Sequence, residues 1–203
     1  MKNFTDHIKS LNNGKIDYFI TDLNLNIFHD KLDNSVILSG SFNPIHYAHT
    51  KLLNYCSKIL DRNKFYEISI FNVDKPNITT DDLIGRIKNF NDNGKIIITR
   101  NSRFVEKAKL FPKSYFVVGF DTAIRILDES YLNKNQSLDD FFDVIKETEC
   151  VFVVGGRVNV TGPKFDNLKL NEINDKYRDF FIILDEEEFR EDISSTHERR
   201  HNN

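Results

Sequence analysis

The chain of 203 residues has no tryptophan, one methionine and two cysteines, and these low counts limit the classes of protein to which it can belong. Cys56 and Cys150 are too few for a disulfide framework, and they form no C-x-x-C pair. No apolar run reaches the roughly 20 residues of a membrane-spanning helix, and the first residues lead into no signal-peptide core. We therefore expect a soluble, reduced, cytoplasmic protein without a membrane partner.

Two common phosphate-binding motifs are also missing. Neither G-x-G-x-x-G nor G-x-x-x-x-G-K-[ST] occurs, which argues against dinucleotide-dependent dehydrogenases and P-loop NTPases. A net charge of −3 provides no general attraction for nucleic acid, so we expect no nucleic-acid partner. The length and the 39% hydrophobic content are sufficient for one domain with a substantial core.

The most informative segment is residues 40–49, GSFNPIHYAH, which follows the apolar run at 36–38. An apolar run, a Gly and Pro turn and then helix-forming residues predict a strand, a tight loop and a helix. The N-terminus of a helix attracts phosphate through its free N–H groups and its dipole. His46 and His49 are three residues apart and share a helix face, where they could donate hydrogen bonds to phosphoryl oxygens. Gly40 permits close backbone approach to a ligand, and Pro44 stiffens the loop.

Strand and helix signals alternate from residue 36 onward. The expected strands are 36–38, 66–73, 95–99, 115–118, 150–154 and 180–184. The expected helices are 48–60, 80–91, 102–109, 121–128, 137–147 and one from 194. This pattern predicts an α/β, Rossmann-like parallel sheet with helices on both faces, whose ligands bind beyond the carboxyl ends of the strands. Residues 1–35, with a helical pattern at 4–11 and a strand at 18–21, are expected to form an N-terminal extension to a domain at 36–203.

The motif at 40–49 resembles G-x-F-[DN]-P-x-H-x-G-H, the signature of the HxGH nucleotidyltransferase superfamily (HUP type). A second block at 193–199, ISSTHER, resembles its C-terminal I-S-S-T-x-x-R motif. The resemblance implies catalytic roles for His46, His49 and Arg199. It also implies nucleotide-binding roles for Gly40, Ser41, Phe42, Asn43, Ser194, Ser195 and Thr196. Two residues depart from the pattern: Ala48 stands at the usual Gly, and Glu198 replaces an apolar residue.

Further blocks resemble the branch that contains nicotinamide and nicotinate mononucleotide adenylyltransferases. The strand-G-x-D block implies that Gly119 and Asp121 contact nucleotide. The acceptor-binding candidates are Asp74, Lys75, Arg86 and Arg157. An ordinary role in a turn or on the surface fits each of these four residues equally well or nearly so. Phe120 and Tyr131 are either core residues or aromatic rings on which a nucleotide base stacks. The resemblance implies ATP and a pyridine mononucleotide as partners, with Mg²⁺ held by the phosphates and no metal-binding side chains. Homo-oligomerisation stays open.

Other interpretations compete with this one. His197 and His201 complete an H-E-x-x-H pattern typical of zinc proteases, but only two residues follow it and no downstream third ligand exists. His46 and His49 as a metal pair lack nearby thiolate or carboxylate partners. The alternatives that stay open are a cytidylyltransferase or another adenylyltransferase with a different phosphorylated acceptor, such as phosphopantetheine or a phosphoalcohol. An ATPase and a non-catalytic nucleotide-binding module stay open too.

Overall fold

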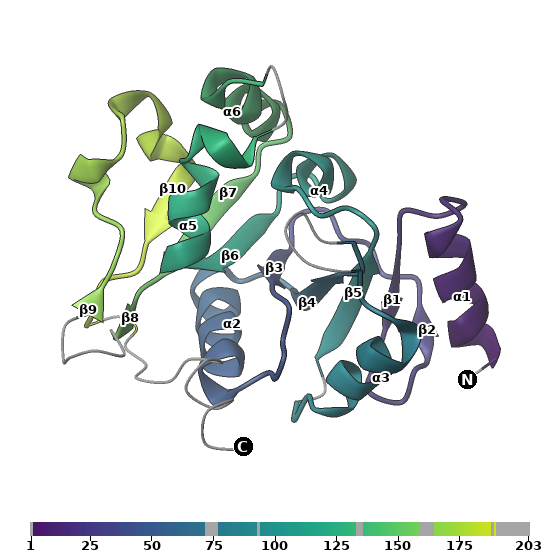
Figure 1. Cartoon of the computed structure of the whole chain (residues 1–203). Helices are drawn as coiled ribbons and strands as arrows, with labels where there is room; N and C mark the ends of the chain where they lie inside the picture. The colour runs from purple at the N-terminus through teal and green to yellow at the C-terminus, as the bar shows by residue number, and fades with distance from the viewer. Residues whose placement is uncertain are drawn as a thin grey trace.

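A computed structural model describes residues 2–71, 77–92, 94–132, 136–158, 165–187 and 189. Their main feature is an eight-stranded sheet in the order β10-β7-β6-β3-β4-β5-β1-β2, covered by helices on both faces (Figure 1). The strands of this sheet are β1 (Tyr18–Thr21), β2 (Ile27–Phe28), β3 (Val36–Ser39), β4 (Lys64–Ser69), β5 (Lys95–Thr99), β6 (Tyr115–Gly119), β7 (Val151–Gly155) and β10 (Phe181–Ile183). A separate two-stranded ladder joins β8 (Arg157–Val158) and β9 (Phe165–Asp166). The predicted α/β, Rossmann-like fold is confirmed.

The order of the parallel strands determines where a ligand binds. Each neighbouring pair from β10 through β7, β6, β3 and β4 to β5 is parallel. In chain order these six strands follow the 3-2-1-4-5-6 arrangement of a doubly wound sheet, which reverses direction between β3 and β6. Ligands of such sheets bind in the crevice beyond the carboxyl ends of the strands at this switch point. Gly40 directly follows β3 and therefore lies at that point.

The helices divide the core into two layers. They are α1 (Lys2–Asn12), α2 (Tyr47–Leu60), α3 (Thr80–Lys88), α4 (Phe104–Leu110), α5 (Phe120–Ile126) and α6 (Leu138–Glu147). Buried side chains of α1, α2 and α3 pack in one apolar cluster, and those of α4, α5 and α6 pack in the other. Alternate residues of β3 enter opposite layers, because Leu38 joins the first cluster and Ile37 the second. Within the described ranges, no helix is both long and apolar enough to cross a membrane.

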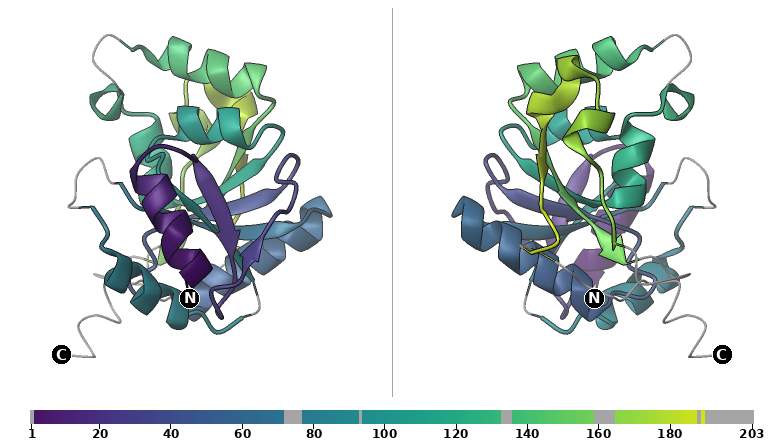
Figure 2. Two further views of the ribbon diagram at one scale, coloured as in Figure 1. Left: turned by 90° about the vertical axis from the view of Figure 1, so that its right-hand side faces the viewer. Right: turned by 90° about the vertical axis from the view of Figure 1, so that its left-hand side faces the viewer.

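The N-terminal segment is integrated into the sheet. The predicted helix and strand are confirmed as α1 and β1, and β1 pairs antiparallel with β5 and with β2. The left view of Figure 2 shows α1 and the β1–β2 hairpin together at this edge of the molecule. Phe4, Ile8 and Leu11 of α1 are buried in the same cluster as α2 and α3. Pairing with β1 satisfies the backbone groups that β5 would otherwise expose as a sheet edge.

Most predicted boundaries lie within a few residues of the observed ones. The strand expected at 66–73 is wrong in extent, since β4 begins at Lys64 and ends at Ser69. Its partner β5 ends at Thr99, opposite Ser69, so the ladder has no further residue to pair. The helix expected at 80–91 ends at Lys88 as α3, and Thr79 caps its N-terminus, since Thr79 Oγ1 accepts a hydrogen bond from the Asp82 N–H. The helix expected from 194 lies outside the described residues.

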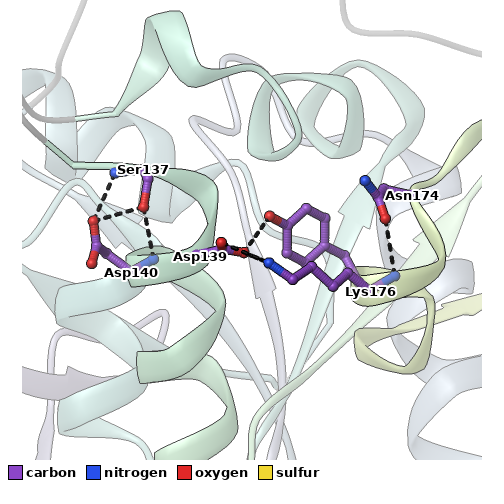
Figure 3. A network of polar contacts seen from close by, with 6 residues as sticks. Ser137, Asp139, Asp140, Asn174 and Lys176 are labelled. Atoms are coloured by element: carbon purple, nitrogen blue, oxygen red, sulfur yellow. Dashed lines mark hydrogen bonds and ion pairs between the residues drawn. The ribbon is translucent and has the colours of Figure 1, made fainter.

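Polar contacts connect α6 to η3 (Asp175–Phe180), the 3₁₀ segment that leads into β10 (Figure 3). Lys176 Nζ donates to both carboxylate oxygens of Asp139 at 2.7 Å, and Tyr177 Oη donates to Asp139 at 2.6 Å. Ser137 and Asp140 form a reciprocal capping box at the start of α6. These contacts fix the approach of the chain to the last strand of the sheet.

Candidate active site

The loop from β3 to α2 is held in an uncommon backbone conformation. Phe42 has a φ of +41°, a region that residues with side chains rarely adopt, and its ring is buried. The ring packs edge-to-face against His49, Tyr66 and Phe90, with centroid distances of 5.2, 5.6 and 5.3 Å. A Cβ at Gly40 would lie 2.9 Å from the Phe42 ring, so glycine is required there. The buried Phe42 ring thus anchors the loop.

His46 and His49 lie together at the N-terminus of α2, as predicted. Their rings stack with centroids 3.7 Å apart and planes inclined by 26°. His46 occupies the N-cap position, and its backbone N–H donates a hydrogen bond to Nδ1 of His49 over 3.2 Å. The two imidazoles are therefore fixed beside the free N–H groups of the first helical turn, where an anion binds favourably.

Burial determines the protonation state of His49, and the same hydrogen bond determines its tautomer. Burial, and to a smaller extent the charge of His46, lower the pKa of His49 from 6.5 to about 3. His49 is consequently neutral at physiological pH. Because Nδ1 accepts the His46 N–H, the single ring proton of His49 resides on Nε2. His49 can thus donate one hydrogen bond from Nε2 to a phosphoryl oxygen.

Arg86 of α3 contacts the loop rather than open solvent. Its Nη1 donates a hydrogen bond to the backbone oxygen of Ser41 over 2.8 Å. Partial burial lowers the pKa of Arg86, and the nearby Asp82 carboxylate opposes that shift. By binding the Ser41 carbonyl, Arg86 holds the peptide group directly before Phe42.

A cavity of about 270 Å³ opens beside this loop, on the layer of α4, α5 and α6. Its wall includes Gly40 and Ser41 of the loop, so it adjoins the histidine site at the switch point of the sheet. The described residues that line it are Ser39, Gly40, Ser41, Glu67, Ser69, Phe71, Ser102, Arg103, Phe104, Val105, Lys107, Thr122, Arg125, Ile126, Tyr131, Leu132, Gln136 and Phe141. Its volume is close to roughly 300 Å³, which is the lower end of the usual range for small-molecule pockets.

An ion pair forms part of the cavity wall. Lys107 Nζ of α4 lies 2.7 Å from Glu67 Oε2 of β4, and the two side chains are only 6% and 1% exposed. Buried pairs of this kind are held by their hydrogen bonds, and removal of one partner leaves a costly lone charge. Sequence reasoning missed this pair, although a Glu inside the apolar strand KFYEIS was a signal for it.

The structure brings some of the predicted site residues to one edge. Gly119 and Gly155 are register partners at the ends of β6 and β7, so the loops that follow these two strands begin at the same edge of the sheet. Gly119 is the N-cap of α5, and the exposed Asp121 lies in the first turn of that helix. Tyr131 lines the cavity, with the Arg125 guanidinium 5.4 Å from its ring centre, whereas Phe120 packs against the core.

Other predicted residues cannot be placed in the site. Asp74, Lys75, Ser194, Ser195, Thr196 and Arg199 lie outside the described residues. Arg157 belongs to β8 by its backbone, and its side chain is outside the description. Asn43 and Ser41 are exposed in the loop, while the Phe42 side chain is buried and leaves only its backbone for a nucleotide.

Within the described part of the chain, no three His, Cys, Asp or Glu side chains come together as a metal site. The H-E-x-x-H pattern at 197–201 lies outside that part.

A doubly wound sheet with a histidine-bearing helix N-terminus at its switch point is an arrangement typical of nucleotide-binding α/β proteins. A family model described as cytidylyltransferase-like matches residues 37–201. The chain belongs to this family, and membership supports an enzyme of the nucleotidyltransferase type. Comparison with curated proteins finds no match.

Proposed function

We propose that this protein is an adenylyltransferase that joins a pyridine mononucleotide to the AMP moiety of ATP, a step of NAD biosynthesis. The observation that carries the proposal is the adjacency of two subsites. One loop connects them, because its first residues Gly40 and Ser41 line the cavity and it ends at the His46–His49 pair at the start of α2. One subsite suits phosphates, and the other contains aromatic residues suited to a flat ring.

In the proposed reaction, an oxygen of the mononucleotide phosphate attacks the α-phosphorus of ATP. The new P–O bond forms as the bond from the α-phosphorus to the bridging oxygen breaks, and pyrophosphate leaves with that oxygen. His49 donates from Nε2 to phosphoryl oxygens that gain charge in the transition state. Arg86 holds the loop, and α2 contributes its N–H groups. The chain's task is positioning and charge stabilisation, without a covalent intermediate.

Mg²⁺ fits this arrangement as a companion of ATP. Magnesium is commonly held by substrate phosphates and waters with few protein ligands, so it needs no dedicated cluster of protein side chains. When bound, it would neutralise charge on the triphosphate oxygens. The resemblance, rather than the geometry, selects a pyridine mononucleotide as the acceptor.

The decisive experiment incubates the protein with Mg²⁺, with ATP or CTP, and with each member of an acceptor panel, and identifies the products by mass. We expect a dinucleotide and pyrophosphate from ATP and a pyridine mononucleotide. Products with CTP and a phosphoalcohol, or with phosphopantetheine, would overturn the acceptor. Release of ADP alone would indicate an ATPase, and binding without turnover would indicate a non-catalytic module.

The C-terminal motif has its own test. Arg199→Ala should impair the use of ATP, because a guanidinium contact to phosphate is lost, while removal of residues 201–203 should be tolerated. Loss of activity in that truncation, together with zinc bound to the intact protein, would revive the metalloprotease interpretation.

A further inference from the structure

Two buried oxygens in the cavity wall have no hydrogen-bond partner among the described residues. They are Ser39 Oγ of β3 and Glu67 Oε1 of β4. Buried polar atoms are nearly always hydrogen-bonded, so each unmatched one requires an explanation. An unmatched carboxylate oxygen is especially unfavourable in a protein interior, because a charged group loses its hydration there.

The two residues lie side by side. Ser39 and Glu67 are register partners on the neighbouring parallel strands β3 and β4. Both residues line the cavity, so both lie on the face of the sheet that borders it. Adjacent strands are about 4.8 Å apart, which is a distance that one small planar group can bridge.

Lys107 determines the chemistry that Glu67 offers. Its ammonium group donates to Oε2 at 2.7 Å, which leaves Oε1 of the carboxylate as a hydrogen-bond acceptor. The Ser39 hydroxyl can donate one. The wall therefore offers one acceptor beside one donor.

We propose that Ser39 and Glu67 recognise the carboxamide of the acceptor ring, and that the enzyme takes the amide form of the mononucleotide in preference to the acid form. This inference rests on the proposed function, whose acceptor pocket it specifies. A carboxamide N–H matches Glu67 Oε1, and its carbonyl oxygen matches the Ser39 hydroxyl. A carboxylate on the ring has no N–H and would place a second negative charge against Glu67.

The cations of the wall are compatible with this assignment. Lys107 is neutralised by Glu67, and among the described residues no ion pair joins Arg103 to Glu67. Arg103 and Arg125, which also line the cavity, are available for the acceptor phosphate. One of the Arg103 nitrogens, Nη1, is also buried without a partner in this part of the chain, so Arg103 is the residue that would serve an acid-form ligand instead.

The test measures the binding of nicotinamide mononucleotide and of nicotinate mononucleotide by calorimetry, without ATP, so that it does not depend on turnover. The native protein should bind the amide form at least about tenfold more tightly, as expected when a polar site leaves a group unmatched. Glu67→Gln should remove or reverse this preference, because the Gln side chain can turn an N–H toward a carboxylate. Thermal unfolding of the same variant establishes that it is folded.

A second substitution, which changes less of the site, tests the proposal without altering Glu67. Ser39→Ala should weaken binding of the amide form by about tenfold. The matched control is Ser57→Ala on α2, which does not line the cavity and whose hydroxyl already donates a hydrogen bond to the Arg62 carbonyl at 2.6 Å. This control should leave the ratio of the two affinities unchanged.

Several results would overturn the inference. They are equal affinities in the native protein, an unchanged ratio in a folded Glu67→Gln variant, and amide binding by Ser39→Ala as tight as the native value. A preference for the acid form that disappears in Arg103→Gln would transfer the role to Arg103. Selective binding of the amide form with no dinucleotide product would refute the proposed function alone, whereas equal turnover of both forms would refute the inference alone.

Discussion

The backbone N–H of His46 donates a hydrogen bond to Nδ1 of His49, and this bond leaves the neutral imidazole with its proton on Nε2. The helix cap and the proposed catalytic donor are therefore one structural unit. Stacking against His46 and edge-to-face packing on Phe42 restrict the His49 ring on two further sides. A donor held in this way needs little reorganisation when charge develops on a bound phosphate.

The tautomer leads to a prediction that separates capping from catalysis. His49→Ala should lower turnover by about 100-fold, the usual effect of removing one transition-state donor, and weaken ATP binding much less. His49→Gln, whose amide nitrogen can approach the position of Nε2, should retain more turnover than His49→Asn, whose shorter amide replaces Nδ1. Steady-state kinetics with thermal unfolding would measure both effects. The exposed His29→Ala is the control, and near-native turnover in His49→Ala would refute the role of His49.

The lowered pKa of His49 predicts how stability depends on pH. The folded-state pKa is about 3, below the unfolded value of 6.5, so the unfolded chain takes up this proton first as the pH falls. The contribution of neutral His49 to stability is therefore complete above about pH 6.5 and is lost progressively toward pH 3. Within this window the native protein should lose up to about 1.4 kcal/mol per pH unit more than His49→Gln. Urea unfolding of both proteins across the window measures the difference, and parallel curves would contradict it.

The sequence predicted the fold and the position of the histidine-bearing loop well, for a physical reason. Apolar strands alternating with helices permit few arrangements, and the segment 40–49 contains its turn, cap and histidines within one short stretch. Interactions between distant segments carry no such local signal. Lys107 and Glu67 are 40 residues apart along the chain, and Arg86 reaches Ser41 across 45 residues.

The cavity wall shows the same limit in detail. The sequence did not single out Ser39 or Glu67, because their adjacency exists only in the register of β3 with β4. Likewise, the helix and the strand within residues 1–35 could be predicted from the sequence. The pairing of that strand with β5 could not, because sequence periodicity does not show which strand forms the edge of the sheet.

Arg86 is expected to act through the loop. Arg86→Ala removes the hydrogen bond to the Ser41 carbonyl and should reduce kcat/KM for ATP by about ten- to 100-fold, because small displacements of positioning groups are costly. Arg86→Lys should recover part of this loss, since one N–H suffices for a carbonyl. The exposed Lys88→Ala on the same helix serves as the control. If only the KM for the mononucleotide rose, Arg86 would instead contact the acceptor phosphate.

The last prediction concerns the N-terminal segment. Phe4 is fully buried and packs edge-to-face on Phe19 of β1 at 5.5 Å, inside the cluster that also contains α2 and α3. Phe4→Ala should therefore lower the free energy of unfolding by about 3–5 kcal/mol, the typical loss for a large core side chain. Lys9→Ala, an exposed residue of the same helix, should leave it nearly unchanged.

Urea unfolding, monitored both by circular dichroism and by the binding of an active-site ligand, shows whether the N-terminal segment unfolds together with the sheet or separately. If residues 1–35 fold as one unit with the sheet, the Phe4→Ala transition should shift as a single step by both signals, because α1 and α2 share one core layer. A separate early transition of α1, with the ligand-binding transition still at its native midpoint, would show that the segment is an independent appendage. In that case the β1–β5 pairing would not couple the segment to the stability of the site.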